Sequence, residues 1–65
     1  MEISVNAEPR KVENTALSDV LAELGFASPS IATAVNGSFV PRTERETTTL
    51  NQGDRLEILS PMKGG

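Results

Sequence analysis

The sequence predicts an α+β fold in which one helix packs on one face of a mixed five-stranded sheet. Two patterns carry this prediction. Apolar residues alternate with polar ones near both ends of the chain, which is the period of a half-buried strand. Between these ends lies one stretch with the period of an amphipathic helix. A chain of 65 residues has room for one small domain, and we expect residues 1–65 to form it.

The first two strands are predicted from alternation and turn residues. Residues 1–5 alternate apolar and polar side chains and form the first strand. Turn residues follow at 6–9, among them Asn6 and Pro9. Residues 10–13 then return as a short edge strand, whose charged side chains discourage association between sheet edges.

The helix is predicted over residues 17–24, where four apolar residues recur at i, i+3, i+4 and i+7. These residues are Leu17, Val20, Leu21 and Leu24. Thr15 is expected to cap the N-terminus with its side-chain hydroxyl. Gly25 suits the left-handed position that ends a helix, and Phe26 suits the apolar contact that often follows.

A β-hairpin is predicted around Asn36-Gly37, because a type I′ turn needs positive φ at both of its central residues. We interpret this dipeptide as a turn and nothing more. Residues 31–35 and 38–40 are the paired strands, and the two-residue loop places Ala34 opposite Phe39.

Loops flank this hairpin at residues 27–30 and 42–49, the second with room for one helical turn. Arg42 and Arg45 in the second loop are expected to be solvated. Residues 55–59 form the last strand. Because the first and last strands are the most apolar, they should be central and pair in parallel. A hairpin, a crossover helix and three further strands make the β-grasp, or ubiquitin-like, roll.

The composition argues against an enzyme. The chain has no cysteine, and therefore no thiolate metal site, and no histidine, which is the commonest general base and metal ligand. Acidic pairs such as Glu44 and Glu46 are expected to be solvated. A net charge of −3 argues against nucleic acid, and no apolar run approaches about 20 residues. We expect a cytoplasmic protein that is monomeric when free, holds no metal or cofactor, and binds neither nucleic acid nor membrane.

The C-terminus is the candidate functional site. Residues 60–65 form a tail that ends in Gly64-Gly65. We expect this tail to be flexible and to reach about 20 Å when extended. Glycine has no side chain, so the tip can enter a narrow channel. The Gly65 carboxylate is ionised and a poor electrophile. Once it is adenylated, a sulfur nucleophile can displace AMP and leave a thiocarboxylate.

The sequence resembles the ThiS family of sulfur carriers over essentially its whole length. The most specific parts are Val35-Asn36-Gly37, Val40-Pro41-Arg42 and the terminal Gly64-Gly65. The other matching parts are residues 1–6, residues 17–24, and Gly53-Asp54 with the last strand. Thr33 departs from the usual aliphatic residue at a core-facing position, which predicts a small loss of core stability.

The resemblance implies a cycle in which an E1-like adenylating enzyme of the ThiF type uses ATP and Mg²⁺ to activate Gly65. Pro61, Met62, Lys63 and Gly64 are the tail residues inserted into partner sites. A cysteine desulfurase or another donor supplies persulfide sulfur. The thiocarboxylate then gives sulfur to a thiazole synthase of the ThiG type in thiamine biosynthesis. The carrier is a co-substrate rather than an enzyme.

A docking patch for the adenylating enzyme is predicted on the sheet face that the helix leaves open. Its residues are Ala32, Ala34, Phe39 and Leu59. An aromatic residue beside an exposed leucine suits an interface.

Three other functions fit the same residues. The chain could carry sulfur for molybdopterin or another sulfur-transfer pathway. It could be a ubiquitin-like modifier that is conjugated to proteins through Gly65. It could also be a β-grasp interaction module whose tail has no function.

Overall fold

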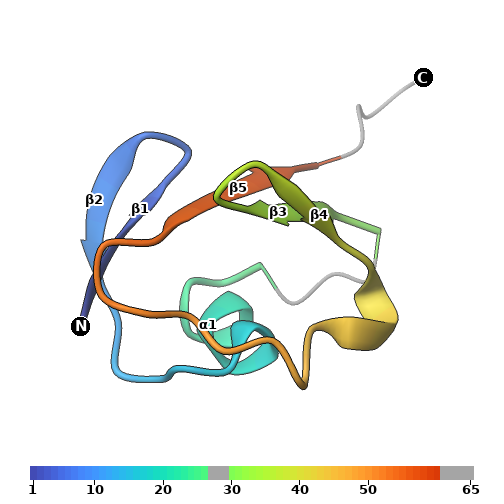
Figure 1. Cartoon of the computed structure of the whole chain (residues 1–65), viewed down its shortest axis with the longest axis horizontal. Coiled ribbons are helices and arrows are strands. Elements are labelled where there is room, and N and C mark those ends of the chain that lie inside the picture. The colour runs from blue at the N-terminus through green and yellow to red at the C-terminus, as the bar shows by residue number, and fades with distance from the viewer. Residues whose placement is uncertain (27–29, 61–65) are drawn as a thin grey trace.

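The computed structural model has the predicted architecture, with one α-helix packed on one face of a mixed five-stranded sheet (Figure 1). It describes residues 1–26 and 30–60. Most of the loop predicted at 27–30, and the tail beyond Ser60, lie outside the described residues. In chain order, the elements are β1 (Glu2–Val5), β2 (Glu8–Lys11), α1 (Leu17–Glu23), β3 (Ala32–Val35), β4 (Ser38–Val40), the 3₁₀ helix η1 (Arg42–Glu44) and β5 (Arg55–Leu59).

The sheet has the strand order β2-β1-β5-β3-β4, with β5 in the middle. β1 and β5 run parallel, and Val5 lies opposite Leu56. The other neighbouring strands are antiparallel. The prediction that the first and last strands are internal and parallel is therefore confirmed. In Figure 1, α1 lies beneath the sheet and the other face is open.

The predicted β3–β4 hairpin is confirmed. Asn36 and Gly37 have φ values of 51° and 85°, as a type I′ turn requires. Ala34 pairs with Phe39, which is the register that the two-residue loop predicts.

The turn between β1 and β2 is shorter than predicted. Asn6 and Ala7 alone form it, with φ values of 51° and 71°, and β2 runs from Glu8 to Lys11 instead of over 10–13. Pro9, which we expected in the turn, lies in β2 opposite Ser4. Proline has no N–H and is tolerated in a strand at the edge of a sheet, so it did not mark the turn.

The helix ends as predicted. Gly25 has φ 89°, and its N–H donates to the carbonyl of Ala22, while the N–H of Phe26 donates to that of Leu21. This pair of bonds is a Schellman motif, which satisfies carbonyls at the end of the helix. Phe26 and Leu24 pack against the core at its rim.

The N-terminus of the helix is not capped by Thr15, so that prediction is wrong. Ala16 occupies the capping position and makes no side-chain hydrogen bond. The loop after β4 caps the helix with its own carbonyls. The N–H of Leu17 donates to Thr48 at 2.8 Å, and the N–H of Ser18 donates to Arg45 at 3.0 Å. Free amides at a helix start need such partners.

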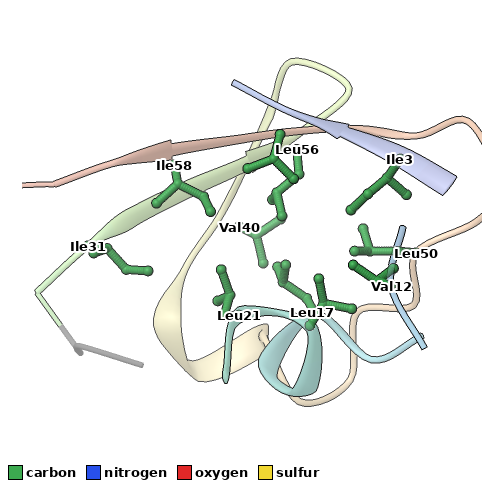
Figure 2. Close-up of a cluster of buried hydrophobic side chains, with 11 residues drawn as sticks. Ile3, Val12, Leu17, Leu21, Ile31, Val40, Leu50, Leu56 and Ile58 are labelled. Carbon is green, nitrogen blue, oxygen red and sulfur yellow. The ribbon is translucent and has the colours of Figure 1, made fainter. Parts of the chain in front are cut away.

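The core lies between α1 and the sheet (Figure 2). Leu17 and Leu21 extend from the helix toward side chains of the sheet. The sequence did not predict two core residues, Val12 and Leu50, which are each 1% exposed. The buried apolar residues are Ile3, Val5, Val12, Leu17, Val20, Leu21, Ile31, Val40, Leu50, Leu56 and Ile58. Met1 and Val35 are only partly buried and pack against this cluster.

Arg45 is buried, at 7% exposed, and the prediction that it is solvated is wrong. Its Nε donates to Thr33 Oγ1 at 3.3 Å, and its Nη2 donates to the carbonyl of Ile31. The Thr33 hydroxyl in turn donates to the carbonyl of Val40 at 2.9 Å. Thr33 therefore serves a buried polar network that joins the loop after β4 to β3. Arg42 is exposed, as predicted.

We predict that Arg45→Ala lowers the free energy of unfolding by about 2 kcal/mol, because it leaves buried acceptors without their donor. The matched control is Arg42→Ala in the same loop, which should change the free energy of unfolding by less than about 0.5 kcal/mol. Urea unfolding of both variants measures the difference. Equal effects of the two substitutions would show that the Arg45 network does not stabilise the fold.

Glu23 ties the start of the crossover to the helix. Its carboxylate accepts hydrogen bonds from the backbone N–H groups of Glu13 and Asn14 at 2.8 and 3.2 Å. The bond from Glu13 is the main reason that the pKa of Glu23 is lowered from its ordinary value of 4.5. A lowered pKa means that the folded state favours the ionised form.

We predict that Glu23 contributes stability that is present above pH 4.5 and is lost as the pH falls through its lowered pKa. The free energy of unfolding of the wild type and of Glu23→Gln should therefore converge on acidification. Denaturant unfolding over a pH series measures this difference. A difference that stays constant from neutral pH to well below 4.5 would contradict the assigned role.

Candidate functional site

The predicted sulfur-carrying residue, Gly65, and the tail residues before it lie outside the described residues. These tail residues are Pro61, Met62, Lys63 and Gly64. β5 ends at Leu59, and Ser60 is the last residue described. The site is therefore built from the strand that leads to the C-terminus and from the sheet face around the end of that strand.

The two neighbours of β5 support it unequally. β3 pairs with it from Leu56 to Leu59. β1 pairs with it only at Arg55 and Leu56, because the chain then turns back into β2. On the β1 side, the second half of β5 therefore lies beside the β1–β2 turn and has no strand to pair with.

Asn6 in that turn bonds to β5 through both its backbone and its side chain. Its backbone N–H donates to the carbonyl of Leu56 at 2.9 Å. Its Oδ1 accepts the N–H of Ile58 at 2.8 Å, and its Nδ2 donates to the carbonyl of Ile58 at 3.2 Å. The Asn6 amide therefore bonds to the N–H and to the carbonyl of Ile58, as the backbone of β1 would if that strand were longer. In this way it continues the parallel pairing of β5 toward the C-terminus.

Asn36 bonds to the opposite end of β5. Its backbone N–H donates to the carbonyl of Arg55 at 2.8 Å, and its Oδ1 accepts the N–H of Arg55 at 2.9 Å. Its Nδ2 donates to Asp54 Oδ1 at 3.1 Å. The interpretation of Asn36-Gly37 as a turn only was therefore incomplete. An asparagine in a turn indicates that side-chain hydrogen bonds to the backbone are possible. The sequence does not identify the partner, because Arg55 is 19 residues away.

The four residues predicted as a docking patch share the open face of the sheet. Ala32 pairs with Leu59, and Ala34 lies between Phe39 and Glu57. Phe39 and Leu59 are 68% and 74% exposed.

A hollow of about 300 Å³ lies on this face, and Asn6 belongs to its lining. The other lining residues are Ala32, Thr33, Ala34, Phe39, Glu57, Ile58 and Leu59. The structure thus brings the predicted patch together beside the end of β5. Its docking role stays a prediction.

Residues 1–26 and 30–60 contain no group of three or more acidic side chains that could hold a metal ion. No helix within those residues is long and apolar enough to span a bilayer.

The comparisons of this chain with known proteins all point to the same family. The sequence model of the ThiS family matches residues 3–65. The sulfur carrier protein ThiS of Thermus thermophilus is 33% identical over 61 residues, which cover 94% of this chain and 95% of that protein.

Solved structures agree with this family. The crystal structure of the thiamine biosynthesis protein ThiS from Geobacter metallireducens superposes with a TM-score of 0.82 at 29% identity, over the whole of both chains. A solution structure of a thiamine biosynthesis protein from the same organism gives 0.81 at 29% identity, over all of this chain and 88% of that one. From its sequence match, its named relative and its β-grasp fold, we conclude that the chain belongs to the ThiS family.

Proposed function

We propose that this chain carries sulfur as a thiocarboxylate on Gly65 and delivers it to a thiazole synthase. The family and its named relatives support the broader role, that of a sulfur carrier in thiamine biosynthesis rather than a catalyst. The observation that carries the finer proposal is the family match that extends to Gly65, together with a central strand that leads to this terminus.

Activation of the carboxylate is the first step of the proposal. An adenylating enzyme of the ThiF type, with ATP and Mg²⁺, transfers AMP to the Gly65 carboxylate and releases pyrophosphate. The negative charge that repels nucleophiles is thereby removed, and AMP becomes the leaving group. The chain has no cysteine or histidine, so the catalytic groups for this step belong to the partner.

Sulfur transfer is the second step. The terminal sulfur of a persulfide, made by a cysteine desulfurase or another donor, attacks the Gly65 carbonyl carbon and displaces AMP. This forms an acyl disulfide. A thiol then supplies two electrons by cleaving the sulfur–sulfur bond. The thiocarboxylate leaves with the terminal sulfur, and the donor and the thiol end as a mixed disulfide. At a thiazole synthase of the ThiG type, the thiocarboxylate sulfur bonds to an electrophilic carbon of the acceptor. The bond between sulfur and the Gly65 carbonyl carbon then breaks, and an oxygen atom from the acceptor or from water takes the place of the sulfur and restores the carboxylate.

Docking of the adenylating enzyme on the open sheet face is part of the same proposal. Leu59 is the last residue of β5, and an extended chain of six residues reaches about 20 Å from it. An enzyme that holds the terminal carboxylate must therefore lie close to the end of β5. The exposed Phe39 and Leu59 offer an apolar anchor there, of the aromatic and aliphatic kind that concentrates binding energy.

We predict that intact mass spectrometry will detect the replacement of one oxygen by sulfur after incubation with ATP, the adenylating enzyme and a persulfide donor. Fragmentation should place the change at Gly65. The matched control is the chain without Gly64 and Gly65, which should keep its mass.

An unchanged wild-type mass, with an enzyme that activates its own carrier, would contradict the proposal. Isopeptide-linked species of higher mass in cells would instead support a modifier. A thiocarboxylate that thiazole synthase does not consume would support another sulfur-transfer pathway.

We predict that Phe39→Ala weakens binding to the adenylating enzyme about tenfold and leaves the fold intact, because the side chain is exposed in the free carrier. Calorimetric titration measures the affinity. Val40→Ala is the matched control. This neighbour is buried on the other face of the sheet, so its loss should lower stability but not the affinity of folded molecules. Unchanged affinity of the Phe39 variant would remove it from the interface, and loss of the fold would place it in the core.

A further inference from the structure

The bonds that Asn6 makes to Ile58 replace strand pairing where β1 has already ended. β3 supports β5 on one side as far as Leu59. On the other side, the Asn6 amide holds both polar backbone groups of Ile58, at 2.8 and 3.2 Å. One side chain therefore decides whether the end of β5 is held from both sides or from one.

We propose that Asn6 is a positioning residue for the activation of Gly65, an inference that rests on the function proposed above. Its amide keeps β5 extended through Leu59. Two features of the surface depend on this. One is the exposed Leu59 side chain, and the other is the point from which the chain leaves the sheet. Asn6 also lines the hollow of the open face with Phe39 and Leu59.

Each net hydrogen bond changes an equilibrium constant by about fivefold, so loss of the Asn6 amide raises the population in which the end of β5 is frayed. The adenylating enzyme must engage the sheet face and the terminal carboxylate of one molecule together. Only carriers with an ordered strand end fit both contacts, and the apparent affinity falls in proportion to that fraction.

Asn36 is a matched control within the same chain. Asn6 and Asn36 both open a two-residue turn, and both have φ 51°. Each holds β5 with its amide, Asn6 near the C-terminal end and Asn36 at Arg55. Glycine adopts this φ without strain. Asn6→Gly and Asn36→Gly therefore keep the turn and remove one set of side-chain bonds each.

The experiment makes three kinds of measurement on the wild type and both variants. These are the free energy of unfolding, amide hydrogen exchange at Ile58 and Arg55, and the KM and kcat of thiocarboxylate formation at equal concentrations of folded carrier. We expect Asn6→Gly to speed exchange at Ile58 and to raise KM, by at most about fivefold for each of the two hydrogen bonds lost, with kcat nearly unchanged. Asn36→Gly should speed exchange at Arg55 and leave KM within about twofold.

Asn6→Asp keeps an acceptor for the N–H of Ile58 but places a carboxylate oxygen where Nδ2 faced the carbonyl of Ile58, so its KM should also exceed that of the wild type. Equal KM values for the two glycine variants, or a KM that follows the free energy of unfolding alone, would overturn the positioning role while the proposed function stands. A wild-type chain that forms no thiocarboxylate would contradict the proposed function, and this inference with it.

Discussion

The hydrogen bonding of β5 is the constraint on which the rest of the structure depends. This strand lies in the middle of the sheet, supplies Leu56 and Ile58 to the core, and leads to the C-terminus. Its parallel neighbour is too short to pair with all of it. Turn asparagines complete the pairing at both ends. The core, the open face and the start of the tail are thus fixed by one strand.

Polar groups replace missing backbone partners elsewhere in this small fold too. The Arg45 side chain bonds to Ile31 and to Thr33 of β3, and its carbonyl caps α1. At the other end of the same helix, the Glu23 carboxylate accepts hydrogen bonds from the backbone N–H groups of Glu13 and Asn14. In the described part of the chain, no buried side-chain nitrogen or oxygen lacks a partner. A chain of 65 residues has a thin hydrophobic core, so unpaired groups would cost a large share of its stability.

Local patterns in the sequence were enough to predict the helix, the β3–β4 hairpin with its register, and the exposed patch. Each depends on periodicity or on glycine at a positive φ. The predictions that were wrong depend on contacts between residues that are distant in sequence. Thr15 does not cap the helix, and the carbonyls of Arg45 and Thr48 accept hydrogen bonds from the first helix amides instead. Arg45 is buried because Thr33 and Ile31 lie across from it. Charge and polarity alone do not reveal such contacts.

The most direct test of the account is whether the terminal carboxylate is activated, independently of any sulfur donor. Adenylation is reversible, so the exchange of labelled pyrophosphate into ATP by the adenylating enzyme reports activation alone. We predict exchange that depends on the wild-type carrier and is lost when Gly64 and Gly65 are deleted. No exchange with the wild type, for an enzyme that activates its own carrier, or equal exchange with the shortened chain, would contradict it.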